Sequence, residues 1–246
     1  MTPLQPRPPD IAQAGAISGA ILAALVGADP LDIRSRSHWV KFVDYSASHS
    51  AHWKATKNNR LLIQTLGARH VKLLYVTGGN HFSWGGASWA ILSPPANRYT
   101  EDFQAANSSV VYVLRVNGLE FLFTGDIGPP VTREVASRWK AKRLGRATVF
   151  LATHHGSASG STKDILDAID PKWAVLSTGP NTYKHPSPAA IARLEAAGAS
   201  IWCTAVNGTV TARVSAKGSL SWHTSRRPEP WWSATQHRKT GVCVGR

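Results

Sequence analysis

The sequence is poor in cysteine and in acidic residues. Its 246 residues include two cysteines, Cys203 and Cys243, too few for a disulfide framework or a cysteine-rich zinc cluster. Only 14 Asp and Glu stand against 28 Lys and Arg, which gives a formal net charge of +14. Such a charge favours an acidic partner, either nucleic acid or an anionic membrane surface. The alternative is a proteome whose proteins are basic throughout.

A long, uninterrupted apolar run is also missing. The apolar stretch Ile11–Ala28 is broken by Gln13 and Ser18. Only Arg7 is basic in the Pro-rich segment before it, a poor match to the start of a signal peptide. A packed helix is therefore favoured over a signal or anchor at 11–28, which stays the alternative. We expect no stable membrane insertion, and a soluble protein in the cytoplasm.

Composition divides the chain into three parts. Residues 1–9 form a Pro-rich lead that we expect to be disordered. Residues 10–223 carry the periodic pattern of one domain, and residues 224–246 form a basic tail that contains Trp231 and Trp232. Helix signals lie at 10–26, 59–66, 131–144, 163–169 and 188–197. Strand signals lie at 71–76, 87–92, 109–116, 119–124, 147–152, 173–177 and 200–204.

The order of these elements predicts an α/β fold. The turn Asn117-Gly118 joins two strands of a hairpin, and strands alternate with helices after it. This mixture is typical of a sandwich of sheets with outer helices. A last hairpin is expected to turn at Asn207-Gly208, with a return strand that ends near Val214.

Three polar motifs follow apolar strands, at the ends where loops bring side chains to a shared site. Their sequences are Thr124-Gly125-Asp126, His154-His155-Gly156-Ser157 and Asn181-Thr182-Tyr183-Lys184-His185-Pro186. Taken singly, the first is typical of a turn and the third of an ordinary loop. The paired histidines would point to opposite sides of an extended chain, so that one binds a metal and the other contacts substrate or a neighbouring ligand.

The order and spacing of these motifs resemble the competence-type metallo-β-lactamase family, the ComEC/Rec2-like proteins of DNA internalisation. His154 follows Asp126 by 28 positions, and the third motif lies about 30 further on. The flanking segments 107–110, 171–177 and 207–210 match as well. The resemblance covers roughly residues 71–215.

The resemblance implies an αββα sandwich and roles for individual residues. Asp126, His154 and His185 are implied as metal ligands, with Asp126 bridging two ions. Asp126, His155 and Tyr183 are the implied catalytic residues, and Ser157 and Asn181 the implied substrate contacts. The implied cofactor is one or two divalent ions, Zn²⁺ or Mn²⁺, which polarise a phosphoryl or acyl oxygen and activate water.

The chain departs from the family in its N-terminal part. Members carry a His-x-Asp-x-Asp-His-type motif ahead of a Gly-rich helix, and nothing here matches it. We therefore expect the N-terminal strands and the first ligand motif to be missing. His49 and His52, or His81, are weak substitutes, and each is equally explained as a surface residue. Either the chain is truncated with a half-built site, or a partner polypeptide supplies the missing ligands.

The basic residues indicate the class of substrate. The expected helix at 131–144 would present a cationic face close to the site, with Arg138 and Lys142 as substrate contacts. Cations of the tail lie near its two tryptophans. Cationic surfaces with aromatic side chains suit single-stranded nucleic acid. The alternatives are a solvated helix face and a disordered terminus.

Three functional hypotheses remain open. The first is a metal-dependent phosphodiesterase or nuclease that acts on DNA, in an intact or an inactive copy. The second is a non-catalytic nucleic-acid-binding module on a degenerate metallo-β-lactamase fold. The third, a hydrolase of small esters or lactams, gains no support from the basic surface. The sequence does not decide between DNA and RNA, nor does it give the metal or the oligomeric state.

Overall fold

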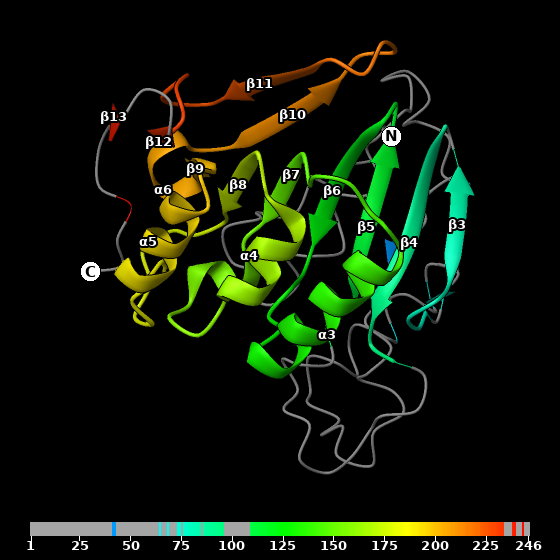
Figure 1. The fold of residues 1–246 in the computed structure, drawn as a ribbon. Helices are drawn as coiled ribbons and strands as arrows, with labels where there is room; N and C mark the ends of the chain where they lie inside the picture. The colour runs from blue at the N-terminus through cyan, green and yellow to red at the C-terminus, as the bar shows by residue number, and fades with distance from the viewer. Residues whose placement is uncertain are drawn as a thin grey trace.

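A mixed β-sheet organises the part of the chain that the computed structural model describes. Those residues are 76–84, 86–95 and 109–233, with the short pieces 41–42, 64, 68, 73–74, 238–239 and 243. They form a nine-stranded sheet in the order β13-β12-β9-β8-β7-β6-β5-β4-β3 (Figure 1). A separate two-stranded parallel pair joins β1 (Lys41–Phe42) to β2 (Leu73–Leu74).

The pairing of the strands changes from antiparallel to parallel in the middle of the sheet. Four successive strands pair antiparallel: β3 (His81–Trp84), β4 (Ala87–Ser93), β5 (Val111–Val116) and β6 (Leu119–Phe123). The next three continue parallel to β6: β7 (Val149–Leu151), β8 (Trp173–Leu176) and β9 (Ser200–Cys203). Because β6 to β9 run the same way, their carboxyl ends meet at one edge of the sheet.

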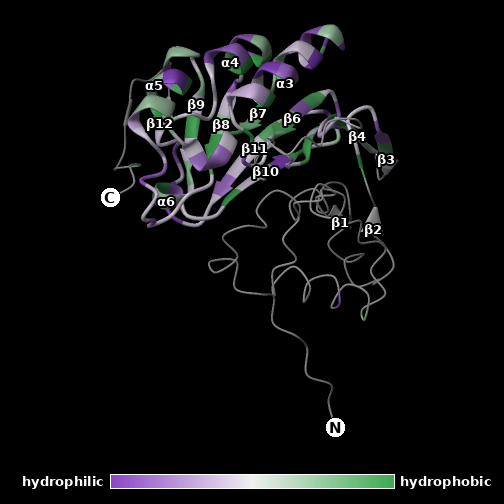
Figure 2. Ribbon diagram, turned by 90° about the horizontal axis from the view of Figure 1, so that it is seen from below, coloured by the Kyte–Doolittle hydropathy of each residue, from purple (hydrophilic) through white to green (hydrophobic). Residues whose placement is uncertain are grey.

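The crossovers between the parallel strands are helices that cover one face of the sheet (Figures 1 and 2). They are α3 (Pro129–Ala141), α4 (Lys163–Ile169) and α5 (Pro188–Ala196). Local sequence fixes where they start. Proline occupies the first turn of α3 and α5, where its missing N–H is not needed. Ser187 caps α5, since its hydroxyl accepts a hydrogen bond from the Ala190 N–H at 3.1 Å.

Successive side chains along each strand point to opposite faces of the sheet, and both faces are buried. In β5, Val111 and Val113 pack toward the helices, whereas Tyr112, Leu114 and Val116 belong to the cluster on the other face. The same alternation continues across the parallel strands. A strand whose two faces are both apolar is typical of a sheet inside a layered α/β sandwich. The predicted α/β fold class is therefore confirmed.

A hairpin of β10 (Val210–Val214) and β11 (Leu220–Thr224) packs on the face opposite the helices. Its Trp222 ring lies 5.5 Å from that of Trp173 and 5.1 Å from that of Trp202, measured between centroids. The tip of the hairpin contacts the turn between β5 and β6, where the Asn117 side chain donates to the Ser215 carbonyl at 2.9 Å. The tip of the hairpin therefore lies at the edge of the sheet opposite the carboxyl ends of β6 to β9, whereas its base follows α6 near the end of β9.

Two predictions about the C-terminal region were wrong. Asn207 does not begin a hairpin turn but ends the short helix α6 (Thr204–Asn207), and the hairpin follows it. The described part of the expected tail is not separate from the fold, because β12 (Trp232–Ser233) pairs with β9 and β13 (Arg238–Lys239) pairs with β12. The predicted N-terminal helices, the disordered lead and the missing first ligand motif lie almost wholly outside the described residues and stay predictions.

A disulfide joins Cys203, at the end of β9, to Cys243. Both cysteines are fully buried. Their pairing was not foreseen, since two cysteines 40 positions apart give no sequence signal. The bond secures the C-terminal segment to the sheet edge. In the described part of the chain, no helix is both long and apolar enough to cross a membrane.

Replacing Cys243 with Ala should lower the free energy of unfolding by about 4 kcal/mol, because the bond restricts a long loop in the unfolded chain. Urea unfolding of wild type and variant measures the loss. Reductant should destabilise the wild type by a similar amount and leave the variant unchanged. Equal stability of the two proteins under oxidising conditions would show that the bond does not form.

Candidate strand-end site

Three loops carry the predicted site residues, and all three leave the carboxyl edge of the parallel strands. Asp126 follows β6, His154 and His155 follow β7, and His185 lies in the loop after β8. Backbone hydrogen bonds join the loops. The His154 N–H donates to the Gly125 carbonyl at 2.9 Å, and the Ser187 N–H donates to the Gly156 carbonyl at 2.8 Å. The fold thus brings residues that are far apart in sequence to one edge.

The first loop requires glycine before the carboxylate. Gly125 has a φ of +55°, and a Cβ there would lie 2.7 Å from the Ser109 Cβ. The Ser109 hydroxyl accepts a hydrogen bond from the Asp126 N–H at 3.2 Å. The Asp126 side chain is 40% exposed, so its carboxylate is open to a ligand. The sequence placed Ser109 in a matching flanking segment but gave it no role beside Asp126.

The paired histidines form a left-handed turn within residues Thr153–Gly156, and the predicted extended geometry was wrong. His154 has φ 48° and ψ 47°, and His155 has φ 54° and ψ 23°. Each such residue other than glycine costs about 1–3 kcal/mol, so the conformation persists only where the surroundings impose it. In this turn both imidazoles can face the same site, with ring centroids 6.5 Å apart.

Buried hydroxyl groups impose the turn from behind. The Thr153 and Ser161 hydroxyls lie 3.1 Å apart, and each also accepts the other residue's backbone N–H. Ser157 is buried, and its hydroxyl accepts from the Gly160 N–H at 3.0 Å. Arg193 donates to three carbonyls of the same segment, those of Ala158, Gly160 and Ser161. Ser157, predicted as a substrate contact, therefore has a structural partner.

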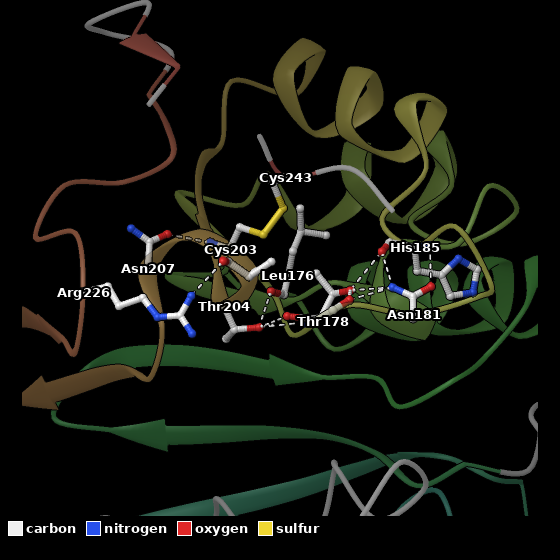
Figure 3. Close-up of a disulfide and its surroundings, with 11 residues drawn as sticks. Leu176, Thr178, Asn181, His185, Cys203, Thr204, Asn207, Arg226 and Cys243 are labelled. Carbon is white, nitrogen blue, oxygen red and sulfur yellow. Dashed lines mark hydrogen bonds between the residues drawn. A yellow bond between two sulfur atoms is a disulfide. The ribbon is translucent and has the colours of Figure 1, made fainter. Parts of the chain in front are cut away.

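The third loop is closed by its own amide side chain (Figure 3). Asn181 accepts from the His185 N–H at 3.0 Å and donates to the His185 carbonyl at 2.7 Å. Thr178 donates to the same carbonyl at 3.0 Å, and its own N–H donates to the Thr204 hydroxyl at 2.7 Å. Thr204 adjoins Cys203, so this loop and the disulfide share one hydrogen-bonded region. Asn181, predicted as a substrate contact, positions His185.

The side chains of the three loops converge. The His155 Nε2 lies 3.5 Å from the Asp126 Oδ1, and its Nδ1 lies 2.8 Å from the Ser177 carbonyl oxygen. A carbonyl oxygen only accepts hydrogen bonds, so Nδ1 is the donor there and Nε2 is the nitrogen that faces Asp126. The His154 and His185 rings lie 5.5 Å apart, and Tyr183 stacks on His185 at 6.0 Å.

The electrostatics of the cluster favour a neutral His185. Burial lowers the pKa of His185, and the neighbouring His154 and His155 lower it further, whereas Asp126 raises it. At neutral pH this imidazole therefore keeps a basic nitrogen. Its Nδ1 is buried without a hydrogen-bond partner among the described residues. An unpartnered buried nitrogen carries a free-energy cost that a metal or a ligand would remove.

The types of ligand atom in this cluster suit a divalent cation such as Zn²⁺ or Mn²⁺. One carboxylate and neighbouring imidazoles are the ligands that Zn²⁺ and Mn²⁺ accept, and the Ser177 carbonyl orients His155 as expected for a ligating histidine. The side chains lie farther apart than the ligands of a formed metal site. Among the described residues, no three His, Cys, Asp or Glu lie close enough together to hold an ion.

Other predicted residues lie away from this cluster. The helix α3 starts next to Asp126 and spans 13 residues, so its basic end lies about 20 Å away along the helix axis. Arg138 and Lys142 belong to that far end, and the Arg138 guanidinium donates to the Leu92 carbonyl. His81 is exposed on the edge strand β3. His49 and His52 lie outside the described residues.

Three curated proteins are similar to this chain. Competence protein ComA of Neisseria gonorrhoeae is 28% identical over 145 residues, which is 58% of this chain and 19% of the relative. ComE operon protein 3 of Bacillus subtilis is 28% identical over 124 residues, 50% of this chain and 15% of the relative. Recombination protein 2 of Haemophilus influenzae is 29% identical over 138 residues, 55% and 16% of the two lengths.

The described residues form a mixed α/β sheet with a layer of helices and a polar cluster at the ends of its parallel strands. The chain is similar to ComEC/Rec2-like competence proteins over about half of its length, so the resemblance inferred from the motifs is confirmed. It spans less than a fifth of the length of each of these relatives. No protein-family model matches the chain.

One solved structure shows a distant likeness. CmlA, a diiron β-hydroxylase from Streptomyces venezuelae, matches 46% of this chain and 26% of its own, with 16% identity and a TM-score of 0.32. A likeness at that level carries no argument about this protein's chemistry.

Replacing Asp126 with Asn should lower the pKa of His185 further, because the carboxylate of Asp126 raises it. Replacing His155 with Gln should have the opposite effect, since His155 lowers that pKa. Titration of the imidazole resonances by NMR in metal-free buffer measures both shifts. An unchanged His185 pKa in both variants would show that these side chains do not share a site.

Replacing Gly156 with Ala should lower the free energy of unfolding by about 2 kcal/mol or more. Gly156 has a φ of +81°, and a Cβ there would lie 2.7 Å from the Pro186 Cβ and 2.8 Å from the Leu176 Cδ2. Gly179 in the neighbouring loop is the matched control, because a Cβ there meets nothing within 4 Å. Equal unfolding midpoints for the two alanine variants would contradict the packing of the second loop against the third.

Proposed function

We propose that this domain is a metal-dependent phosphodiesterase that acts on DNA. The observation that supports it is the convergence of Asp126, His154, His155 and His185 from three strand-end loops. Carboxylate and imidazole side chains at the carboxyl edge of parallel strands suit metal-assisted hydrolysis better than nucleophilic catalysis by a side chain. The relatives named for competence and recombination favour DNA as the substrate, and the formal charge of +14 favours a polyanion.

Asp126, His154 and His185 would hold the ion, as the sequence predicts, and the geometry adds His155. The His155 Nε2 faces Asp126 and its other nitrogen is fixed on a carbonyl. A divalent cation would supply Lewis-acid chemistry, polarising a phosphoryl oxygen and acidifying water. Asn181 holds the backbone of His185 in place, and Tyr183 stacks on that ring at the solvent side.

The site as described is open, and we propose that it needs further ligands for full activity. A partner polypeptide, or a part of the protein beyond the described residues, would provide them. The cytoplasmic location expected from the sequence stays a prediction. The Cys203–Cys243 bond argues against it, because disulfides persist in oxidising compartments and are rare in reducing ones.

Metal binding by the purified chain tests the proposal. We expect weak binding of Mn²⁺ and Zn²⁺ in calorimetric titrations, with little hydrolysis of DNA. Replacing Asp126 with Ala should abolish the binding, whereas the same change at Asp164 should not. Asp164 is a matched control because its carboxylate is exposed and forms an ion pair with Arg133 at 3.9 Å instead of facing a histidine.

Two results would change the account. Equal metal affinity in wild type and Asp126→Ala would contradict the proposed site. Robust Mn²⁺- or Zn²⁺-dependent cleavage that is lost in Asp126→Ala would support the phosphodiesterase but show that other ligands, such as His49 or His52, complete the site.

A second candidate function is nucleic-acid binding without catalysis, and the basic end of α3 favours it. Lys140, Lys142 and Arg143 are exposed and take part in none of the ion pairs between described residues. Other cations nearby are paired: Arg133 with Asp164, Arg138 with Glu134 and Arg146 with Asp170. Three cations without acidic partners at one corner provide a surface for phosphates that does not depend on a metal.

Replacing Lys140, Lys142 and Arg143 together with Ala should weaken DNA binding and flatten its salt dependence. Each phosphate contact contributes about 0.7–0.9 to the slope of log affinity against log salt, so the slope should fall by about 2–3. Arg138 stays unchanged in this variant because it bonds the Leu92 carbonyl and its loss would affect folding. An unchanged slope, measured by fluorescence anisotropy, would mean that this corner is only a solvated surface.

A further inference from the structure

Tyr183 is unusual among the described residues because its large ring faces solvent. The side chain is 78% exposed, the one large hydrophobic side chain of the described part that is so exposed. It lies in the third loop, two positions before His185. Exposing the apolar surface of a ring to water is unfavourable. The exposure of this ring beside the proposed catalytic site therefore suggests that a ligand covers it.

One face of the ring lies toward His185, and the other is open. It stacks on His185 with 6.0 Å between ring centroids and an interplanar angle of 25°. With its exposure of 78%, the opposite face of the ring is open to solvent. A flat molecule could therefore extend the stack outward from His185.

The loop holds this ring ready for such a partner. Asn181 bonds the carbonyls of Gly179 and His185 and the N–H of His185, which closes the loop around Tyr183. Thr178 adds a second bond to the His185 carbonyl at 3.0 Å. A loop fixed before binding loses less conformational entropy when its ligand arrives.

A cation follows Tyr183 in the chain. Lys184 is exposed, and it forms no ion pair with any residue that the structure describes. Its backbone has a φ of 59°, so its side chain leaves the loop in a fixed, left-handed turn. An exposed ring followed directly in the chain by an exposed ammonium group suits a ligand with an aromatic plane and a negative charge.

We propose that Tyr183 and Lys184 form a subsite for one unpaired nucleotide, next to the phosphodiester that the cluster would cleave. The base stacks on the open face of Tyr183 and its phosphate pairs with Lys184. This inference rests on the proposed function and adds a substrate class to it. Because bases inside a duplex already stack on one another, the subsite selects single-stranded DNA or the unpaired end of a duplex.

DNA binding in the presence of EDTA tests the subsite without cleavage. Fluorescence anisotropy compares a single-stranded oligonucleotide with a blunt duplex of the same sequence. Tyr183→Ala should bind the single strand roughly 5- to 100-fold more weakly than wild type and leave the duplex affinity unchanged. Tyr183→Phe should bind like wild type, because stacking needs the ring and not the hydroxyl. His223→Ala, at an exposed position of β11 outside the third loop, is the matched control.

Photocrosslinking gives a second readout at residue level. An oligonucleotide that carries 5-iodouracil should crosslink to Tyr183, located by mass spectrometry, and an abasic site at the same position should remove both the crosslink and the advantage of the single strand. Equal single-strand affinity in wild type and Tyr183→Ala, no measurable single-strand binding by wild type, or crosslinks confined to other residues would each overturn the subsite. Metal binding that depends on Asp126 would still stand in that case, so this failure differs from a failure of the proposed function.

Discussion

The left-handed turn at His154 and His155 is the constraint on which the site depends. Two successive residues other than glycine adopt this conformation, and it costs about 1–3 kcal/mol for each of them. Neighbouring loops hold them there: the Gly125 carbonyl accepts the His154 N–H at 2.9 Å, and the Ser177 carbonyl lies 2.8 Å from the His155 ring. Because those partners belong to the loops after β6 and β8, forming the turn also fixes how the three loops meet.

Support for the turn extends from the site into the rest of the fold. Behind it, the Thr153–Ser161 pair and the three carbonyl contacts of Arg193 tie the loop after β7 to α5. On the other side, Thr178 links the loop of His185 to Thr204, which follows the disulfide-bonded Cys203 (Figure 3). Cys243 is therefore linked to the site through Cys203, Thr204 and Thr178. Polar networks of this kind are stabilising only when each member has its partners.

Sequence patterns predicted the regular elements well and the irregular ones poorly. The helix at 163–169 and the strands around Val111 and Trp173 were found because apolar periodicity and turn residues mark them. The histidine turn was not found, since it follows from contacts with loops distant in sequence and overrides the local preference for extended backbone. The C-terminal hairpin was predicted at the wrong position, because Asn207-Gly208 is a good turn signal but lies at the end of α6. The roles of Ser109, Thr178 and Ser161 became visible only when the loops were brought together.

Anomalous X-ray diffraction from crystals soaked with Mn²⁺ or Zn²⁺ tests the central claim most directly, because it locates an ion without relying on activity. The account predicts an anomalous peak bounded by the Asp126 carboxylate and the imidazoles of the histidine turn and His185, at about 2.0–2.3 Å from the ligating atoms. A peak elsewhere, or none at this edge of the sheet in saturated crystals, would contradict it.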